Sequence, residues 1–297
     1  MIIETSNLTK KYSNKVTALN NVSLSIDTGI FGLLGRNGSG KTTLMRILTT
    51  LIEPTGGTAS ILGMDITPAN KTQLKRSIGY LPQEFGFYPE FSVHDYLMYI
   101  ASIKGMRTSI ARKRVTELLR QVGLAKMQNR KMKKLSGGMK RRAGIAQAML
   151  NNPKILILDE PTAGLDPNER IRFRNLISEL SQDRLVLLST HSVSDIEYIA
   201  NQVLLMKDGK ISHSGTQEEI IQSVPVKVWS CVVANNEVEM WQKQFKVSNM
   251  KTLSDGIELR ILSEKSPHYN AKEETMTLED IFLYYFGEKT GDDYDVL

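Results

Sequence analysis

The sequence predicts an α/β domain with a parallel central sheet, followed by a small α+β domain. Two short runs of apolar residues, 155–158 and 185–188, have the composition of strands that are buried on both faces. Helix-like and strand-like segments alternate around these runs, which favours helices packed against a parallel sheet. Beyond residue 215 the pattern changes to three strand-like segments with few helices. We therefore expect two domains, 1–215 and 216–297.

The other elements follow from hydrophobic periodicity and turn residues. Alternation and short apolar runs predict strands at 2–5, 22–26, 30–34, 203–206, 211–214, 226–233, 246–253 and 257–262. Helical spacing predicts helices over 43–52, 92–103, 110–122, 140–150, 217–221 and 237–245. Gly56 and Gly57 indicate a turn after the first helix, and Asp208 with Gly209 indicates a hairpin. Ser92 and Asp95 have the spacing of a helix cap.

The composition excludes several classes of protein. The chain has 297 residues, 41% of them hydrophobic, which is enough apolar material for a sizeable core. Its single cysteine, Cys231, excludes an intramolecular disulfide and a cysteine metal cluster, and we expect it to be buried. No apolar run approaches the roughly 20 residues that span a bilayer, and the first residues do not resemble a signal peptide. We therefore expect any membrane role to come through a partner.

The segment Gly35 to Thr42 reads Gly-Arg-Asn-Gly-Ser-Gly-Lys-Thr and fully matches the P-loop pattern. A buried strand is expected before it and a helix after it, so its glycines let backbone N–H groups face phosphates at a positive helix end. Lys41 is placed to reach the β- and γ-phosphates, and the Thr42 hydroxyl is placed to bind Mg²⁺. The nucleotide-binding residues expected here are Gly35, Asn37, Gly38, Ser39, Gly40, Lys41, Thr42 and Thr43.

Two carboxylates, Asp159 and Glu160, come directly after the apolar run 155–158. In open α/β sheets, ligands bind at this end of the strands. Asp159 suits a position beside Mg²⁺, and Glu160 suits a group that orients or deprotonates an attacking water. With the P-loop, this pair indicates a nucleoside triphosphatase, with Glu160 and Lys41 as catalytic candidates.

A third motif, Leu-Ser-Gly-Gly-Met at residues 135–139, precedes a basic helical segment. With it, residues 1–215 resemble the ABC transporter ATPase family, whose signature is usually Leu-Ser-Gly-Gly-Gln. The resemblance implies that Ser136, Gly137 and Gly138 form a helix N-terminus that meets the γ-phosphate bound by the opposite subunit. A dimer with ATP held twice between its subunits is therefore implied. Met139 departs from the usual glutamine, and we expect altered contacts there without loss of activity.

Further residues match landmarks of this family in chain order. Tyr12 corresponds to the aromatic residue that stacks on adenine, with ordinary core packing as the alternative. Gln83 corresponds to a glutamine that senses Mg²⁺ and water and leads towards the permease. Asp166 corresponds to the loop that crosses the dimer interface. His191 corresponds to the histidine that contacts the γ-phosphate and joins the catalytic candidates.

The resemblance implies a helical subdomain at about 84–150 and an ATPase that powers a separate membrane permease at the cytoplasmic face of the membrane. ATP and Mg²⁺ are the implied cofactors, the metal being held by Thr42, Gln83 and Asp159. The second partner is another ATPase subunit, and we favour a homodimer over a heterodimer. Residues 277–283 resemble the end of bacterial exporter ATPases that handle drugs, peptides, lipids or ions. A terminal helix that docks on its own domain fits the same residues.

Two other functions are alternatives: a soluble ABC protein and an inactive regulatory subunit. A soluble ABC protein that acts on nucleic acid or ribosomes gains some support from the basic pI of about 9.2. However, such translation factors usually carry two cassettes, and DNA-repair relatives insert a long coiled coil between P-loop and signature. Here there is one P-loop, and no sustained heptads separate it from Ser136, so nucleic acid is disfavoured as a partner. The presence of Glu160 and His191 disfavours an inactive regulatory subunit.

Positive charge is concentrated between Lys104 and Arg142, where fourteen Lys or Arg residues stand against one acid, Glu117. Such a segment favours an anionic neighbour, either acidic permease loops or anionic lipid headgroups. Lys131, Lys133 and Lys134 are the residues we select to represent it. The alternative is a solvated helical face.

Overall fold

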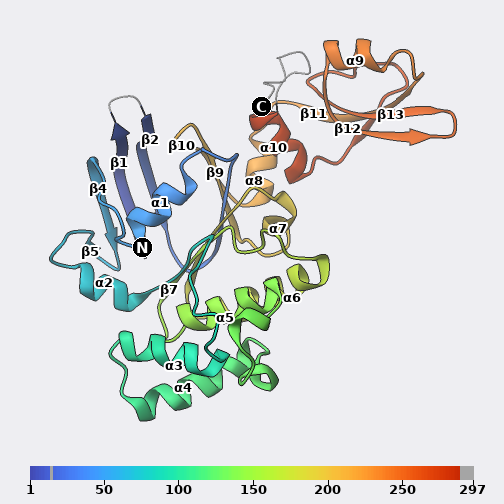
Figure 1. Cartoon of the computed structure of the whole chain (residues 1–297). Coiled ribbons are helices and arrows are strands. Elements are labelled where there is room, and N and C mark those ends of the chain that lie inside the picture. The colour runs from blue at the N-terminus through green and yellow to red at the C-terminus, as the bar shows by residue number, and fades with distance from the viewer. Residues whose placement is uncertain (14–15, 288–297) are drawn as a thin grey trace. The chain divides into compact units, whose positions relative to one another are not determined.

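The computed structural model describes residues 1–13 and 16–287, and the chain divides into two compact units, Met1–Ser214 and a second that begins at Gly215 (Figure 1). The boundary lies one residue from the position expected from the sequence. Residues 288–297, the end of the predicted second domain, lie outside the described residues. None of the described helices has the length and apolar character needed to span a bilayer.

A six-stranded sheet forms the centre of the first unit, in the order β10-β9-β3-β8-β7-β6. Its strands are β3 (Gly29–Leu34), β6 (Ile78–Leu81), β7 (Ile155–Asp159), β8 (Leu185–Thr190), β9 (Gln202–Lys207) and β10 (Lys210–Gly215). Strands β9, β3, β8, β7 and β6 pair in parallel, and every residue of β7 and β8 is buried. The predicted parallel core is therefore present. Asp208 and Gly209 both have positive φ at the β9–β10 turn, as a two-residue hairpin requires.

A second, antiparallel sheet in this unit has the order β2-β1-β4-β5. It comprises β1 (Ile3–Ser13), β2 (Val16–Ile26), β4 (Gly56–Ile61) and β5 (Met64–Asp65). The predicted strands at 2–5 and 22–26 are too short, because register shifts along the β1–β2 pair interrupt the alternation on which that prediction rests. The turn predicted at Gly56 and Gly57 is wrong: both residues lie in β4, where Gly56 pairs with Thr9 of β1 and Gly57, whose φ is +74°, occupies a register shift in that pairing.

The helices of the first unit are α1 (Lys41–Leu48), α2 (Lys71–Ser77), α3 (Val93–Ile103), α4 (Thr108–Gln121), α5 (Gly137–Ala148), α6 (Pro167–Leu180) and α7 (Val193–Glu197). Helices α3, α4 and α5 gather on the side away from the β1–β2–β4–β5 sheet, within the range expected for a helical subdomain (Figure 1). Ser92 caps α3 by accepting a hydrogen bond from the Asp95 backbone, as the spacing predicts. Helix α1 is shorter than expected because the chain turns at Thr50, whose φ is +60°.

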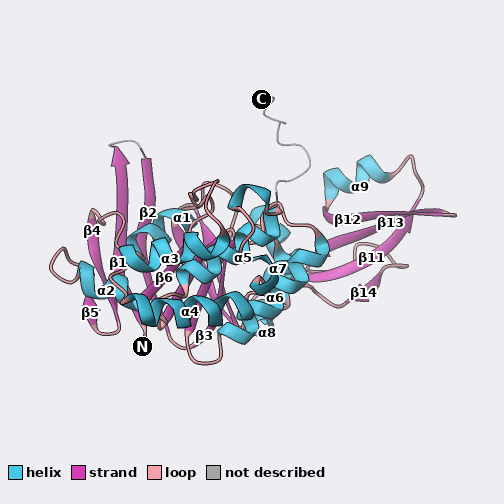
Figure 2. Ribbon diagram, turned by 60° about the horizontal axis from the view of Figure 1, so that its bottom comes forward, coloured by secondary structure: helices cyan, strands magenta, loops and turns pink. Residues whose placement is uncertain are grey.

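The second unit contains a four-stranded antiparallel sheet in the order β12-β13-β11-β14, with helix α9 on one face (Figure 2). Its elements are α8 (Gln217–Gln222), β11 (Lys227–Val233), α9 (Val238–Gln244), β12 (Lys246–Leu253), β13 (Gly256–Ser263), β14 (Lys272–Glu274) and α10 (Leu278–Phe286). The small core of this sheet contains Cys231 and Trp241. Cys231 is buried as expected, and burial raises the pKa of its thiol.

Helix α10 is held to the sheet of its own unit by a buried ion pair. The Asp280 carboxylate accepts hydrogen bonds from Arg260 at 2.7 and 2.9 Å, from Ser248 at 2.9 Å and from Thr277 at 2.8 Å. Burial acts to raise the pKa of Asp280, but these donors outweigh it and hold that pKa below its ordinary value. Docking on its own unit, one of the two interpretations of residues 277–283, is thus what the helix does.

Asp280→Ala should destabilise the second unit by about 3–5 kcal/mol, because it leaves the Arg260 charge without its buried partner. Both tryptophans of the chain, Trp229 and Trp241, lie in this unit, so their fluorescence during denaturant unfolding reports on it alone. Glu279→Ala is the matched control, since Glu279 is exposed on the same helix turn. Equal unfolding midpoints for the two variants would contradict the assignment.

The same pair should make this transition acid-sensitive. A carboxyl with a depressed pKa contributes stability that is complete above its ordinary pKa of 3.8 and is lost as the pH falls through the lower folded value.

Candidate functional site

The loop between β3 and α1 lines a cavity of about 310 Å³. The lining residues are Ala18, Asn37, Gly38, Ser39, Gly40, Lys41, Thr42, Thr43, Gln83 and Glu160. All but Ala18 and Glu160 were expected from the sequence to bind nucleotide or metal, and Glu160 was expected to be catalytic. Gly35 does not line the cavity; its carbonyl oxygen instead accepts a hydrogen bond from Lys41.

The loop closes tightly at Gly40, the residue that precedes α1. Its φ of +107° is strained for any residue with a side chain, and a Cβ here would lie 2.4 Å from the Ala18 carbonyl oxygen. Glycine therefore lets the backbone turn directly into the helix. As a result the N-terminus of α1, with its partial positive charge, opens onto the cavity.

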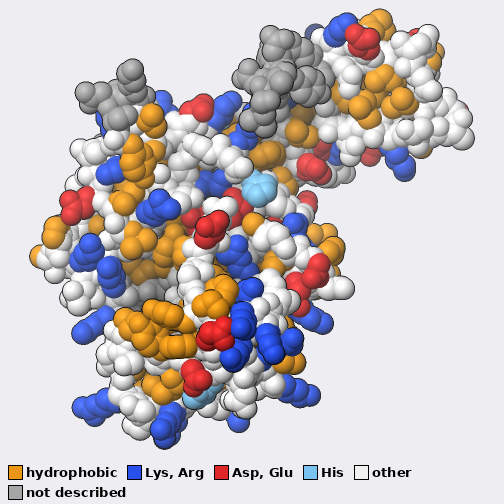
Figure 3. Space-filling model, in the orientation of Figure 1, with side chains coloured by type: hydrophobic (Ala, Val, Ile, Leu, Met, Phe, Trp, Pro, Cys, Tyr) orange, Lys and Arg blue, Asp and Glu red, His pale blue; other side chains and the backbone are white. Residues whose placement is uncertain are grey.

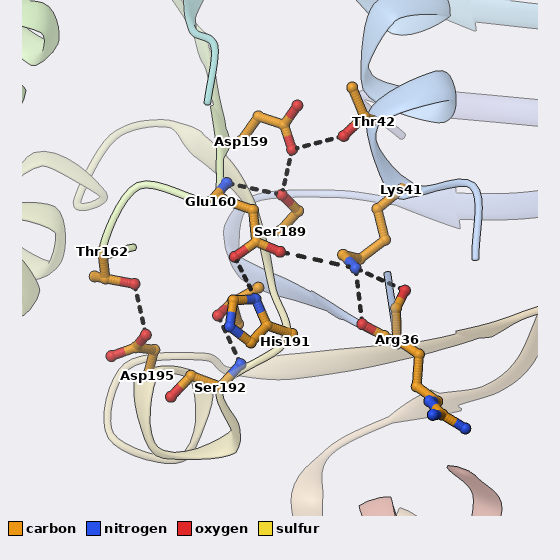
Figure 4. Close-up of polar contacts among 12 residues, drawn as sticks. Arg36, Lys41, Thr42, Asp159, Glu160, Thr162, Ser189, His191, Ser192 and Asp195 are labelled. Atoms are coloured by element: carbon orange, nitrogen blue, oxygen red, sulfur yellow. Dashed lines mark hydrogen bonds and ion pairs between the residues drawn. The ribbon is translucent and has the colours of Figure 1, made fainter. Parts of the chain in front are cut away.

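The Lys41 ammonium is buried and lies between the loop and a carboxylate. It donates hydrogen bonds to the carbonyl oxygens of Gly35, at 2.7 Å, and Arg36, at 3.1 Å, and lies 3.8 Å from Glu160 Oε1 (Figure 4). Burial lowers the pKa of Lys41, while the charges of Glu160 and Asp159 act in the opposite direction. An anion in the cavity would therefore meet a cation whose position is already fixed.

Glu160 lies directly beyond β7 in a strained backbone conformation. Its φ is +46°, which costs a residue with a side chain on the order of 1–3 kcal/mol. The side chain is buried, Oε2 lies 2.9 Å from His191 Nδ1, and Oε1 has no hydrogen-bond partner among the described residues. The strain thus accompanies a carboxylate that lines the cavity, with one oxygen that accepts no hydrogen bond from the described residues and lies 3.8 Å from the Lys41 ammonium.

Asp159 and Thr42 bring oxygen atoms together at the other side of the site. Asp159 Oδ1 accepts hydrogen bonds from Thr42, at 3.2 Å, and from Ser189, at 2.7 Å. Carboxylate and hydroxyl oxygens suit Mg²⁺, which needs few protein ligands when phosphates and water supply the rest. No group of three or more His, Cys, Asp or Glu side chains in the described chain forms a metal site by itself. The donor set therefore fits an ion that enters together with a nucleotide.

Tyr12 lies on β1 near Thr43. Its side chain is 53% exposed, which excludes core packing, and its hydroxyl is 3.4 Å from Thr43 Oγ1. It is not among the residues that line the cavity. An exposed ring beside the first turn of α1 remains available for stacking on a base.

The signature segment stands apart from this cavity. Ser136 caps α5 and accepts a hydrogen bond from the Met139 backbone at 3.2 Å, so Gly137 and Gly138 form the first turn of the helix as expected. A Cβ at Gly138 would lie 2.3 Å from a Glu169 carboxylate oxygen, so this helix start packs closely on α6. Asp166 caps α6 through the Glu169 backbone. None of these residues lines the cavity, so the described unit holds a nucleotide site and a separate signature helix.

Ser189 is a site residue that the sequence analysis missed. It lies at the end of β8, donates to Asp159 Oδ1 and accepts a hydrogen bond from the Glu160 backbone at 3.0 Å. A polar residue that follows four apolar ones, two positions before His191, is the signal that was available. Ser189 therefore connects the two carboxylate residues to the strand that carries the histidine.

The chain was compared with known proteins and structures. The ABC transporter family model matches residues 19–163. The uncharacterized ABC transporter ATP-binding protein YxlF of Bacillus subtilis (strain 168) is 36% identical over 244 residues, covering 82% of this chain and 80% of that protein. The chain belongs to the ABC transporter ATP-binding family.

Other ABC relatives differ in how far the similarity extends. The Nod factor export ATP-binding protein I of Burkholderia orbicola (strain AU 1054) is 30% identical over 98% of both chains. The methionine import ATP-binding protein MetN 3 of Oceanobacillus iheyensis is 38% identical over 72% of this chain and 65% of that protein. Both transport directions are thus represented among relatives.

Solved ABC cassettes have the same fold. The ATP-binding cassette MJ0796, in a dimeric post-hydrolysis state bound to ADP and Pi, is 28% identical, with a TM-score of 0.66 over 72% of this chain and 98% of that chain. Our chain is accordingly an ABC ATPase, the ATP-hydrolysing subunit of a transporter.

Ser189→Ala should reduce the stability of the first unit by about 1–3 kcal/mol, because the buried Glu160 N–H loses its acceptor. Far-UV circular dichroism during denaturant unfolding measures this loss, and ATP turnover should fall as Asp159 and Glu160 lose their connection. The same substitution at Ser25, an exposed serine of β2, serves as the control. If both variants behave alike, the inferred role of Ser189 is wrong.

Proposed function

We propose that this ABC ATPase works as a dimer on the cytoplasmic face of the membrane, where it drives a separate permease, with an exported substrate. The observation that carries the proposal is that Lys41 and Glu160 line the cavity, with His191 bonded to Glu160 and Asp159 bonded to Thr42, while the signature helix neither lines the cavity nor bonds to these residues. A second copy has to supply that helix.

The residues in and around the cavity have separate roles in ATP hydrolysis. The loop amides and Lys41 bind the β- and γ-phosphates, and Tyr12, at the edge of the site, stacks on the adenine. Glu160 takes up or orients the proton of the attacking water with Oε1, which accepts no hydrogen bond from the described residues. His191 is hydrogen-bonded to Glu160 Oε2 and contacts the γ-phosphate. The same histidine thus contacts both the base and the phosphate that is cleaved.

Thr42, Asp159 and Gln83 would hold Mg²⁺ when ATP is present, and the ion would supply charge that neutralises the phosphate oxygens. The 3.2 Å contact between Thr42 and Asp159 and the position of Gln83 in the cavity lining support this set of ligands.

The dimer follows from the separation of the two phosphate-binding elements. Ser136, Gly137 and Gly138 present a capped helix N-terminus, which is a site for an anion, yet they lie outside their own subunit's cavity. ATP bound by one copy and met by the signature of the other would draw the subunits together. Hydrolysis removes the bridging phosphate and lets them part. Two copies of this chain can supply both elements, so a second kind of ATPase subunit is not needed.

A groove of about 740 Å³ in the first unit is the place we assign to the permease. Apolar Ile78, Tyr80 and Ile103 line it together with Lys75 and Lys104, and Arg76 adds a third positive charge. No acidic side chain lines it, and burial lowers the pKa of Lys104. An amphipathic segment with acidic residues, such as a cytoplasmic loop of a permease, has the matching chemistry.

The groove is also connected to the nucleotide site. Ile78 and Tyr80 belong to β6. Gln83, which lines the nucleotide cavity, is the second residue after the end of that strand. A segment that presses on β6 therefore acts on a residue beside the phosphates. This short path gives the permease and ATP a physical means of influencing each other.

The charges that we selected from the sequence are less suited to this role. Lys131 and Lys133 pair with Glu90 at 2.8 and 2.5 Å, and these contacts lower the pKa of Glu90 to about 2. Part of the basic segment is thus neutralised within the subunit. On the face shown in Figure 3, apolar side chains gather over α3 with basic ones around them.

Export is supported by one match that extends through the second unit. The match to the Nod factor exporter protein of Burkholderia orbicola covers 98% of this chain, whereas a second Nod factor exporter protein covers 75% and the methionine importer proteins cover 68–75%. We therefore assign residues 216–297 to an accessory domain of an exporter ATPase, whose cargo is a drug, peptide, lipid or ion.

Glu160→Gln should still bind ATP and dimerise, but its turnover should fall at least 100-fold, since general base catalysis contributes about 10²–10⁴. Steady-state hydrolysis and nucleotide-dependent dimerisation by size-exclusion chromatography measure the two properties. Lys41→Ala should lose nucleotide affinity as well. Glu179→Gln, on the exposed face of α6, is the control. Near wild-type hydrolysis by the Glu160 variant would refute the assignment of the base.

Lys75→Glu combined with Arg76→Glu should release the permease, because both substitutions place negative charge at the groove. Affinity purification in mild detergent, followed by identification of the co-purifying membrane protein, measures assembly with the wild type and each variant. Arg112→Glu with Lys113→Glu makes the same change in charge on the exposed face of α4. Equal recovery with both double variants contradicts docking in the groove, and recovery of nucleic acid or ribosomes in place of a membrane protein contradicts the proposed function.

A further inference from the structure

We propose that Asp195, acting through Thr162, is a positioning residue that fixes Glu160 and His191 against each other. The inference rests on the roles given above to these two residues. It concerns a pair of side chains that the cavity does not include and that no part of the proposed mechanism uses.

The two side chains form a buried contact between the loop after β7, which contains Thr162, and helix α7, which contains Asp195. Thr162 and Asp195 are 4% and 2% exposed, and the Thr162 hydroxyl donates to Asp195 Oδ2 at 2.5 Å (Figure 4). The other carboxylate oxygen, Oδ1, is buried with no hydrogen-bond partner among the described residues. Burying a carboxyl group with so few partners is costly, so the Thr162 hydrogen bond is the main compensation for its position.

Both residues of the contact are close in sequence to the catalytic candidates Glu160 and His191. Thr162 is two residues after Glu160, and Asp195 is four residues after His191. A backbone hydrogen bond closes a short turn at each of the two segments. The Ala163 N–H donates to the Glu160 carbonyl oxygen at 3.3 Å, and the Asp195 N–H donates to the Ser192 carbonyl oxygen at 3.2 Å. A displacement at either end of the Thr162–Asp195 contact therefore passes directly to Glu160 or His191.

Glu160 needs such restraint on both sides. Its positive φ persists only if the surrounding structure holds it, and Ser189 fixes its N–H from the direction of β8. Thr162 supplies the second restraint, on the side where the chain leaves the strand. His191, whose side chain is 54% exposed, has little packing of its own to fix its ring.

Neither Thr162 nor Asp195 lines the cavity, so their effect should appear in turnover and not in nucleotide binding. Thr162→Val keeps the shape of the side chain and removes the hydroxyl. We expect its kcat for ATP hydrolysis to fall about 10- to 100-fold, the range for a small displacement of a catalytic group, while KM for ATP stays within about twofold. Thr162→Ser retains the hydroxyl and should restore most of the rate.

A double-mutant cycle separates positioning from general loss of structure. If the pair acts by holding His191 against Glu160, Thr162→Val should lower kcat by a clearly smaller factor in a His191→Ala background, where only its restraint on Glu160 is left to lose. A variant that only weakens the fold would lower kcat by the same factor in both backgrounds. That result, or a KM that rises in step with the fall in kcat, overturns the inference.

Asp195→Asn guards against a variant that simply fails to fold. Its amide oxygen can still accept the Thr162 hydrogen bond, so it should retain a rate close to that of the wild type, whereas Asp195→Ala should behave like Thr162→Val. Loss of activity in both Asp195 variants, with normal folding by circular dichroism, contradicts the role given to the hydrogen bond. The test of Glu160→Gln above remains separate, because it can fail or succeed whatever happens at Thr162.

Discussion

The parallel pairing of β3, β8 and β7 determines where the phosphate loop, the two carboxylates and His191 lie. Strand β8 is hydrogen-bonded to β3 on one side and to β7 on the other, so the three strands end at the same edge of the sheet. The phosphate loop follows β3, the two carboxylates follow β7 and His191 follows β8. Residues more than a hundred positions apart therefore meet because their strands are neighbours, and the short loops need only turn towards one another.

This arrangement also explains why one subunit holds only part of a catalytic site. The sheet edge gathers the loop, the base and the metal-side residues, but the signature helix α5 begins elsewhere, packed on α6 through Gly138 and Glu169. Since α5 and α6 contact each other so closely, the signature and the Asp166 loop should move together. In the proposed dimer, such a movement in one copy would reach the phosphates held by the other.

Motifs and buried strands were predictable from the sequence because their causes are local. A glycine-rich loop between strand and helix, or a run of four apolar residues followed by two acids, is found in few other structural contexts. The long β1 and β2 strands were underestimated, because bulges break the alternation and only pairing across the sheet reveals them. Ser189, Thr162 and Asp195 were missed for a similar reason: each is an ordinary polar residue until the fold places it beside a partner from another segment.

The backbone at Glu160 has a consequence for how this sequence can change over time. Its left-handed conformation suits glycine or asparagine better than glutamate, so replacing Glu160 with glycine would relieve strain while removing the carboxylate. Selection for a more robust fold alone would therefore favour an inert subunit. If Glu160 is the base, as proposed, this chain therefore keeps a strained residue at some cost in stability.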